Sequence, residues 1–268
     1  TWDIRTRWAW GFSGDAESFA ANYRGAVDAA DRYGVEGIVI WGFLRDSHGG
    51  IEAARRVADY AHDRGVMVLP GVGIDTYGGV FYSGQSPWSL DCWLQDHPEA
   101  IARRPDGSPF TFRWPASDPT QRMVGCPSHE PTMDFYRSSL DWLIETFELR
   151  GLQIEQGDVG LCWCDRCRAR TRTPCPKKCE VTDRVCLEDM AGRLPPLVEH
   201  VLSRAPDATV LVENYCGLLP EQTRVIAPFL EGFDSRAWHS WQAYDAPGVF
   251  DIDSNSRSPA PHGCLAIR

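Results

Sequence analysis

Three cysteines in one short segment carry the clearest chemistry in this chain. Cys162, Cys164 and Cys167 follow the pattern C-x-C-x2-C. Thiolates at this spacing can occupy three corners of a tetrahedral zinc site, so a fourth ligand must come from elsewhere in the chain. A site closed by four protein ligands leaves no position for water, and we therefore expect such a zinc to be structural.

Two carboxylates lie directly before this cysteine segment. Residues 152–155 are expected to form a buried strand, with Glu155 at its end and Asp158 in the turn that follows. Glu213 closes a second apolar run, where an unpaired buried carboxylate would be costly without a purpose. We predict that Glu213 and one of Glu155 or Asp158 form a catalytic pair, with Asp158 favoured as the acid and Glu213 as nucleophile or base.

The segments around these residues alternate between strand and helix. Apolar runs typical of buried parallel strands alternate with segments that repeat apolar residues every three or four positions. The expected strands are one ending within residues 8–12, then 35–43, 66–74, 152–155, 208–213 and 236–241. The expected helices are 15–33, capped by Ser13, then 51–64, 131–150, 187–204 and 220–230.

This alternation predicts an α/β fold, and specifically a (β/α)8 TIM-type barrel that is incomplete or irregular at its C-terminal end. Residues 249–252 and 264–267 are candidates for two further strands, without a helix between them. An open doubly wound sheet is the alternative, although no G-x-G-x-x-G motif follows the first strand. We expect one domain over residues 1–268, with a long functional loop at about 75–126 and a cysteine-rich loop at about 156–186.

The active sites of such barrels lie at the C-terminal ends of the strands. Those ends carry acids, aromatic rings and hydrogen-bonding groups, which together suit the apolar faces and hydroxyl groups of sugars. The tryptophans among these aromatic residues can instead be core residues. Asp75, at the end of the third strand, can instead cap a turn. The predicted substrate-binding residues are Trp41, Asp75, Tyr77, Asn214, Tyr215, Trp238, His239 and Trp241.

The overall composition narrows the classes of partner. The net charge of −10 and the lack of a long basic run argue against nucleic acid. No apolar stretch approaches the roughly 20 residues needed to span a membrane. Because Thr1 is not a start methionine, we expect a processed N-terminus or a fragment. Zinc binding favours a cytoplasmic location, whereas a processed N-terminus would allow secretion. The sequence leaves open whether the chain forms a homo-oligomer.

The pieces around the cysteines resemble the zinc-bearing β-galactosidases of glycoside hydrolase family 42. The resemblance covers roughly residues 120–170, where Cys126-Pro127-Ser128 precedes a helix, the acid-bearing strand and the C-x-C-x2-C segment. It implies that Cys126 is the fourth zinc ligand and that the barrel is a glycosidase. The family's Asn-Glu pair is replaced here by Glu155-Gln156-Gly157-Asp158, and its nucleophile on the seventh strand has no clear counterpart.

The expected function is therefore a glycoside hydrolase-like enzyme that acts on a carbohydrate and holds a structural zinc. A different barrel enzyme, such as a metal-dependent hydrolase or a lyase on acidic sugars, is one alternative. A non-catalytic carbohydrate-binding barrel or an inactive fragment is the other. Three further cysteines lie outside the motif: Cys175, Cys179 and Cys186. Their interpretation is either a second metal site or disulfide bonds.

Overall fold

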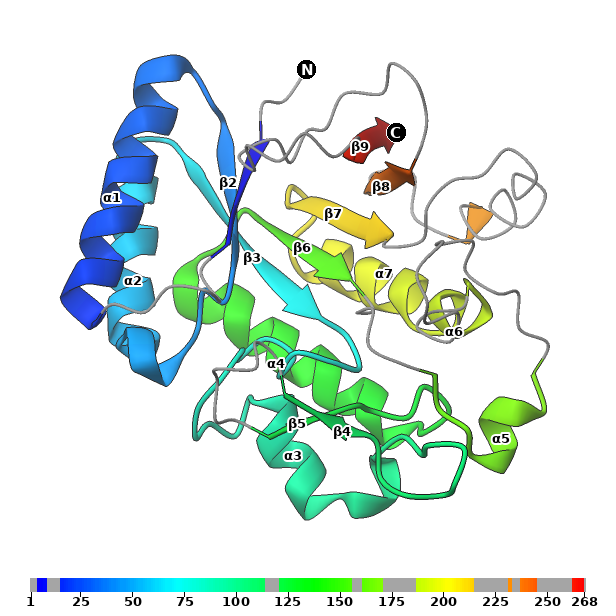
Figure 1. Cartoon of the computed structure of the whole chain (residues 1–268). Helices are drawn as coiled ribbons and strands as arrows, with labels where there is room; N and C mark the ends of the chain where they lie inside the picture. The colour runs from blue at the N-terminus through cyan, green and yellow to red at the C-terminus, as the bar shows by residue number, and fades with distance from the viewer. Residues whose placement is uncertain are drawn as a thin grey trace.

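The computed structural model describes residues 4–8, 15–113, 121–155, 161–170, 187–214, 231–232, 237–244 and 262–267. For residues 4–8, 187, 214, 238–244 and 262–267 the description is of the backbone. The architecture is α/β, with a seven-stranded sheet in the order β1-β2-β3-β6-β7-β8-β9 (Figure 1). Its strands are β1 (Ile4–Trp8), β2 (Gly37–Trp41), β3 (Met67–Gly73), β6 (Gly151–Glu155), β7 (Thr209–Asn214), β8 (Trp238–Tyr244) and β9 (His262–Ile267).

The sheet is parallel from β1 to β8. Strands β2, β3 and β6 are buried along their whole length, as strands covered on both faces require. The last pair, β8 with β9, is antiparallel. Among the described residues, β1 and β9 form the two edges of the sheet, so the predicted parallel sheet is confirmed and complete closure into a barrel is not shown.

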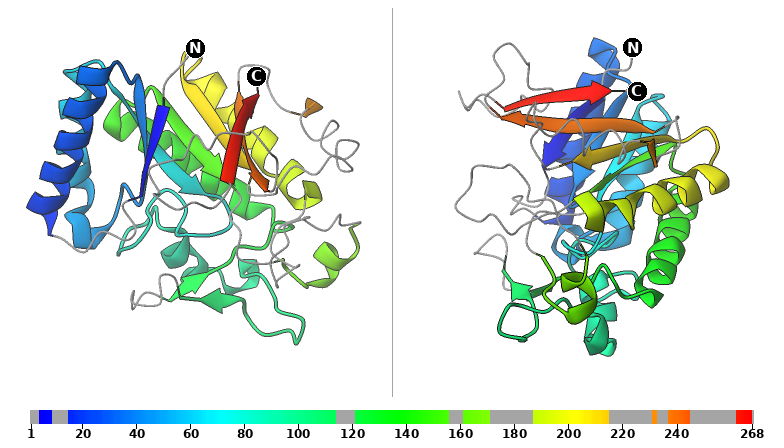
Figure 2. Two further views of the ribbon diagram at one scale, coloured as in Figure 1. Left: turned by 45° about the horizontal axis from the view of Figure 1, so that its top comes forward. Right: turned by 90° about the vertical axis from the view of Figure 1, so that its right-hand side faces the viewer.

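Helices cover the outer face of this curved sheet (Figure 1, Figure 2). Asp15 caps the first one by accepting a hydrogen bond from the Ser18 backbone N–H, and Gly34 ends it in the left-handed region with φ 69°. The predicted cap, Ser13, lies outside the described residues. The helices are α1 (Ala16–Tyr33), α2 (Gly50–His62), α4 (Pro131–Phe147), α6 (Leu187–Ala191) and α7 (Leu194–Arg204).

The helix predicted over 187–204, with Pro195 and Pro196 disturbing its middle, is divided into α6 and α7 in the structure. Pro195 and Pro196 explain the division. A proline is tolerated in the first turn of a helix, where its missing N–H has no partner to lose, but it disrupts a helix interior. The chain therefore breaks after α6 and starts α7 with the two prolines near its beginning.

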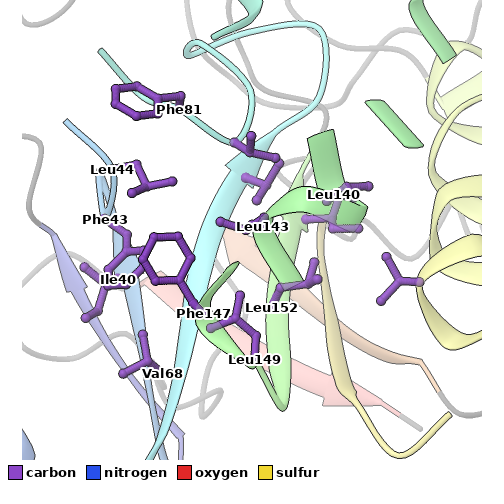
Figure 3. Close-up of a cluster of buried hydrophobic side chains, with 14 of the residues drawn as sticks. Ile40, Phe43, Leu44, Val68, Phe81, Leu140, Leu143, Phe147, Leu149 and Leu152 are labelled. Carbon is purple, nitrogen blue, oxygen red and sulfur yellow. The ribbon is translucent and has the colours of Figure 1, made fainter. Parts of the chain in front are cut away.

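The two faces of the sheet are packed differently. On the outer face, Ile40, Val68 and Leu152 meet the apolar side of α4 in the main core (Figure 3). The inner face carries a smaller buried cluster of Val39, Trp41, Met67 and Leu69, with Leu211 packed against it. Because neighbouring positions of a strand point to opposite faces, this division decides which residues can line a site inside the sheet.

The predicted long loop after β3 is a small structured layer. It contains α3 (Leu90–Asp96), the short helix η2 (Pro98–Ala100) and the two-stranded sheet of β4 (Thr111–Phe112) and β5 (Arg122–Met123). A buried ion pair of 3.2 Å between Arg122 and Asp91 joins β5 to α3. β3 runs toward this layer, so the layer lies at the C-terminal end of the strands (Figure 1).

Candidate active site and cysteine centre

Two carboxylates lie side by side at the C-terminal ends of β6 and β7. Glu155 and Glu213 are partners in the parallel register of these strands. Leu211, two residues before Glu213, packs in the inner cluster, so Glu213 shares its face. The side chains are 5% and 3% exposed, respectively. Strand register therefore brings together two of the three predicted catalytic acids on the inner face.

Two glycines of β3, beside Gln153 and Glu155, make room for aromatic rings on the inner face. Gly73 is the register partner of Glu155, and Gly71 is the partner of Gln153. A Cβ on Gly73 would lie 3.1 Å from Cβ of Tyr77, and a Cβ on Gly71 would lie 2.4 Å from the Trp41 ring. The two rings therefore occupy the space over these glycines, which places half-buried Tyr77 beside Glu155.

Trp41 lies one layer deeper than the acids. Its side chain is 2% exposed and packs with Val39, Met67 and Leu69. This placement gives Trp41 a core role inside the sheet, and its predicted role as a sugar platform stays untested.

The turn after β3 is held by a buried polar network. Asp75 is 2% exposed, and its carboxylate accepts a hydrogen bond of 2.7 Å from the Tyr136 hydroxyl. The same hydroxyl accepts from the Asp75 backbone N–H at 3.0 Å, and Arg193 Nε lies 4.0 Å from the carboxylate. The structure therefore uses Asp75 to fix the turn, and its predicted contact with sugar stays untested.

Burial dominates the electrostatics of this network. It raises the pKa of Asp75, against the lowering effects of the Arg193 charge and the Tyr136 hydrogen bond. Burial and the neighbouring Asp75 charge also raise the pKa of Tyr136 well above its ordinary value. The raised pKa keeps the Tyr136 hydroxyl protonated near neutral pH, as donation to Asp75 requires.

The backbone of this turn is strained. Asp75 and Tyr77 have φ values of 68° and 54°, in the left-handed region that residues with a side chain rarely adopt. Such conformations persist where the surroundings fix them, and they cluster at functional sites. Here the Tyr136 hydroxyl holds Asp75, and Tyr77 is directed over Gly73.

The four predicted zinc cysteines lie together at the outer end of this layer. All four sulfur atoms of Cys126, Cys162, Cys164 and Cys167 are within 4.8 Å of one another. Cys126 Sγ lies 3.7, 3.6 and 3.7 Å from the sulfurs of Cys164, Cys162 and Cys167, respectively. Four sulfurs at about 2.3 Å from one tetrahedral zinc would be about 3.8 Å apart, so the residues present fit such an ion.

The thiols of Cys126, Cys162 and Cys167 are close enough to shift one another's pKa, which is raised for the first two and lowered for Cys167. Hydrogen bonds with Cys162 and Cys167, together with burial, raise the pKa of Cys126 far above its ordinary value. Several thiolates so close together repel one another, and a divalent cation removes that penalty. The Arg103 backbone N–H and the Arg170 guanidinium each lie 3.3 Å from a sulfur, on Cys162 and Cys167, and can donate to a thiolate.

The cysteine centre joins two segments that are distant in the sequence. Cys126 follows β5, whereas the other three cysteines lie in or beside α5 (Asp165–Arg168). Arg193 connects the centre to the strained turn, because its guanidinium donates to the Cys126 carbonyl at 2.6 Å while its Nε lies near Asp75. The Gly125 backbone N–H donates to the Asp75 carbonyl at 2.7 Å, which adds a second connection.

The remaining predicted residues are described only in part. Asn214 ends β7 and pairs in register with Trp241, while Trp238 and His239 pair with Leu211 and Val212. For these residues the backbone alone is described. Asp158, Tyr215, Cys175, Cys179 and Cys186 lie outside the described residues.

Sequence reasoning missed several residues that shape the site. Gln153 donates a side-chain hydrogen bond from Nε2 to Glu213 Oε2. Its position in an otherwise apolar strand, two residues before Glu155, was the available signal. Tyr136 and Arg193 gave no comparable signal, because each reads as an ordinary helix residue until the fold places it against Asp75.

Several solved structures of glycoside hydrolases are similar to this chain in fold. No family profile and no curated protein matches the sequence. A glycoside hydrolase family 20 β-N-acetylglucosaminidase matches with a TM-score of 0.53 at 10% identity, over 91% of this chain and 52% of its own. A family GH13_31 enzyme matches with a TM-score of 0.51 at 13% identity, over 81% and 47%. An α-galactosidase from Lactobacillus brevis matches with a TM-score of 0.50 at 12% identity, over 79% and 26%.

These similarities concern the fold. The chain spans about half or less of the three matched chains. The matches do not show the resemblance to glycoside hydrolase family 42, which stays a prediction. No helix among the described residues is long and apolar enough to cross a membrane.

Proposed function

We propose that this protein is a glycosidase that cleaves a glycosidic bond with a pair of carboxylates, Glu213 and Glu155. The observation that carries the proposal is the register of β6 and β7, which places the two acids as neighbours at the C-terminal ends of adjacent strands. Barrel enzymes hold their catalytic residues at these ends. The glycoside hydrolase folds among the structural matches support the same class of reaction and a carbohydrate substrate.

The spacing of the strands favours a retaining reaction. Neighbouring strands are about 4.8 Å apart, and side chains of equal length on one face keep roughly that separation. Retaining glycosidases hold their carboxyl groups about 5–5.5 Å apart, whereas inverting enzymes need about 6.5–9.5 Å to admit a water. Two glutamates in register fit the shorter separation.

The chemistry follows from this pair. The Glu213 carboxylate attacks the anomeric carbon while protonated Glu155 gives its proton to the leaving oxygen, so the glycosidic bond breaks as a glycosyl ester forms. Glu155 then removes a proton from water, which attacks the ester and releases the sugar and Glu213. Asp158, three residues beyond the end of β6, is the alternative acid, and the same assay tests it.

We further propose that Cys126, Cys162, Cys164 and Cys167 hold a structural zinc. Four protein sulfurs complete a tetrahedral set and leave no ligand position for substrate, so the ion would stabilise the rim without taking part in bond cleavage. The support is the 3.6–3.7 Å separation of Cys126 Sγ from the other three sulfurs, which matches the edge of such a site. Half-buried Tyr77, over Gly73 and beside Glu155, is the described aromatic residue best placed to contact a sugar.

A panel of aryl glycosides tests the function. The purified chain is incubated with α- and β-linked nitrophenyl glycosides, and NMR records the anomer that is released first. We expect turnover of at least one glycoside with retention. Release of the opposite anomer would contradict the retaining assignment, and binding without turnover of any glycoside would favour a carbohydrate-binding barrel.

Matched variants identify the acids. Glu213→Gln, Glu155→Gln and Asp158→Asn are compared with Glu199→Gln, which changes an exposed glutamate on α7. We expect Glu213→Gln and Glu155→Gln to lose activity and Glu199→Gln to keep it. If Asp158→Asn loses activity while Glu155→Gln retains it, Asp158 is the acid.

A further inference from the structure

We infer that Gln153 is a positioning residue that holds Glu213 in its ionised form and thereby divides the roles between the two acids. The inference rests on the proposed function for its catalytic meaning, but it makes a separate statement about which carboxyl group carries the charge. Its basis is the hydrogen bond from Gln153 Nε2 to Glu213 Oε2 across β6 and β7.

The strand register explains why Gln153 reaches Glu213 and leaves Glu155 at the end of its strand. Gln153 pairs with Leu211, and Glu155 pairs with Glu213. Residues two apart on a strand share a face, so Gln153 and Glu155 lie on one face with Glu213 diagonally across from Gln153. A glutamine side chain has the length for this diagonal reach.

On the β3 side of Gln153, the space is filled by an aromatic ring. Toward β3, Gln153 faces Gly71, and the ring of Trp41 fills the space above that glycine. Gln153 is 5% exposed, so its polar end must find a partner inside the protein. The carboxylate of Glu213 is the partner that the structure gives to its N–H group.

The direction of this hydrogen bond separates the two acids. A carboxylate accepts from an amide N–H, and this contact favours the charged form, as does any hydrogen bond made to that form. Two buried carboxylates on adjacent strands disfavour simultaneous ionisation. When Gln153 stabilises the charge on Glu213, the proton shared by the pair is left to Glu155.

The other groups around Glu213 are compatible with this division. On the inner face, Glu155 of β6 is the titratable register partner of Glu213, and Tyr77 lies over Gly73 of β3, beyond Glu155. On β8, Ser240 is the register partner of Glu213, with His239 and Trp241 on either side in sequence. The carboxyl that needs a proton for leaving-group protonation is therefore Glu155, and Glu213 is the nucleophile.

A direct titration of the two carboxyl groups tests the inference without requiring activity. The full chain is labelled with 13C at the side-chain carboxyl of glutamate, and NMR follows the signals with pH. Glu213→Gln and Glu155→Gln assign the two signals. We expect Glu213 to titrate at lower pH than Glu155. Gln153→Met keeps the length but removes the donor, and it should raise the titration midpoint of Glu213 by about one unit.

Leu211→Met is the control for packing, because Leu211 is the register partner of Gln153 and has no polar group. It should leave both midpoints unchanged. If Glu213 titrates above Glu155 in the unchanged protein, or if Gln153→Met does not move Glu213, the inference is overturned. An amide oxygen turned toward a protonated Glu213 would give that first result.

Activity gives the second readout and separates the two proposals. On the best aryl glycoside, Gln153→Met should move the acid limb of the kcat/KM profile to higher pH and lower kcat about tenfold, with KM little changed. An unshifted profile would contradict the role of Gln153. If no glycoside is hydrolysed but the titrations behave as expected, the charge assignment stands and the glycosidase proposal fails.

Discussion

The acid pair and the cysteine centre are positioned in opposite ways. Glu155 and Glu213 lie on adjacent strands of the main sheet, where backbone pairing and a large core fix their relation. The four cysteines lie on connections after β5 and β6, and they are brought together outside the main sheet. The sheet can therefore hold the acids in place without any ion. The cysteine segments, by contrast, are expected to depend on the proposed zinc that their sulfurs bind together.

The two regions are connected through the strained turn after β3. Arg193 contacts the Cys126 carbonyl and lies near Asp75, and Tyr77, two residues further on, lies beside Glu155. If this comparison is right, damage to the acids should remove activity and leave stability, whereas damage to the cysteines should lower stability first.

The acid pair should show the largest effect on activity with little effect on folding. Glu213→Gln and Glu155→Gln are each expected to lower kcat by about a thousandfold or more, because each removes a group that acts on the reacting bond. The free energy of unfolding should be unchanged or higher, since one of two neighbouring buried acids becomes neutral. Steady-state kinetics and urea denaturation measure the two quantities, and unfolding of both variants would contradict the division.

Loss of the zinc should destabilise the cysteine centre before it affects strands β6 and β7. Protein purified under reducing conditions should contain one zinc per chain by elemental analysis. Cys162→Ser should lower the free energy of unfolding by about 3 kcal/mol or more, because metal binding contributes directly to folding. Hydrogen exchange should speed up first in residues 121–126 and 161–170, and later in β6 and β7.

Cys92→Ser is the matched control, because Cys92 is a free cysteine outside the cluster. It should keep the zinc and nearly all of the stability. Absence of zinc from the unchanged protein would contradict the metal proposal, while leaving the acid pair untouched.

The connection between the regions should show an intermediate, pH-dependent effect. Tyr136→Phe removes the hydroxyl that binds Asp75 and should cost about 1–3 kcal/mol, as expected when a buried polar group loses its partner. Burial already raises the pKa of Asp75, and the lost hydrogen bond lowered it. A raised folded-state pKa means that stability falls as pH rises from the unfolded-state pKa through the folded-state pKa, so the loss should be greater at neutral than at acidic pH.

Denaturant unfolding at about pH 5 and about pH 7.5 measures this difference. Tyr60→Phe is the control, because it removes a hydroxyl that donates to exposed Asp28 at 2.7 Å. That variant should lose little stability at either pH. An equal loss for Tyr136→Phe at both pH values would show that Asp75 has the same charge throughout the range.

The aromatic residue at the rim should show the smallest effect. Tyr77→Ala removes the ring beside Glu155 but no group that transfers a proton. We expect KM to rise up to about tenfold, equivalent to about 1.4 kcal/mol, with kcat nearly unchanged. A large fall in kcat with an unchanged KM would instead place Tyr77 in the chemistry, and the comparison between chemical and supporting residues would need revision.

The order of the elements and most of the chemistry-bearing residues can be read from local patterns in the sequence. The apolar runs around Ile38–Trp41 and Val68–Gly73 predicted buried parallel strands, because a strand covered on both faces has no polar side to show. Glycine and proline marked several helix ends for local steric reasons, as Gly34 does after α1. The cysteine spacing predicted a cluster, since three thiols within six residues lie close in most conformations.

Which of these residues lie together depends on contacts between distant segments of the fold. Register between β6 and β7 paired Glu155 with Glu213 and turned Gln153 toward Glu213, which no local pattern encodes. The fold also buried Trp41 and Asp75, which the sequence had suggested for a sugar site. The physical reason is that strand position gives only the face of the sheet, whereas depth and partners depend on residues from distant segments, such as Tyr136 and Arg193.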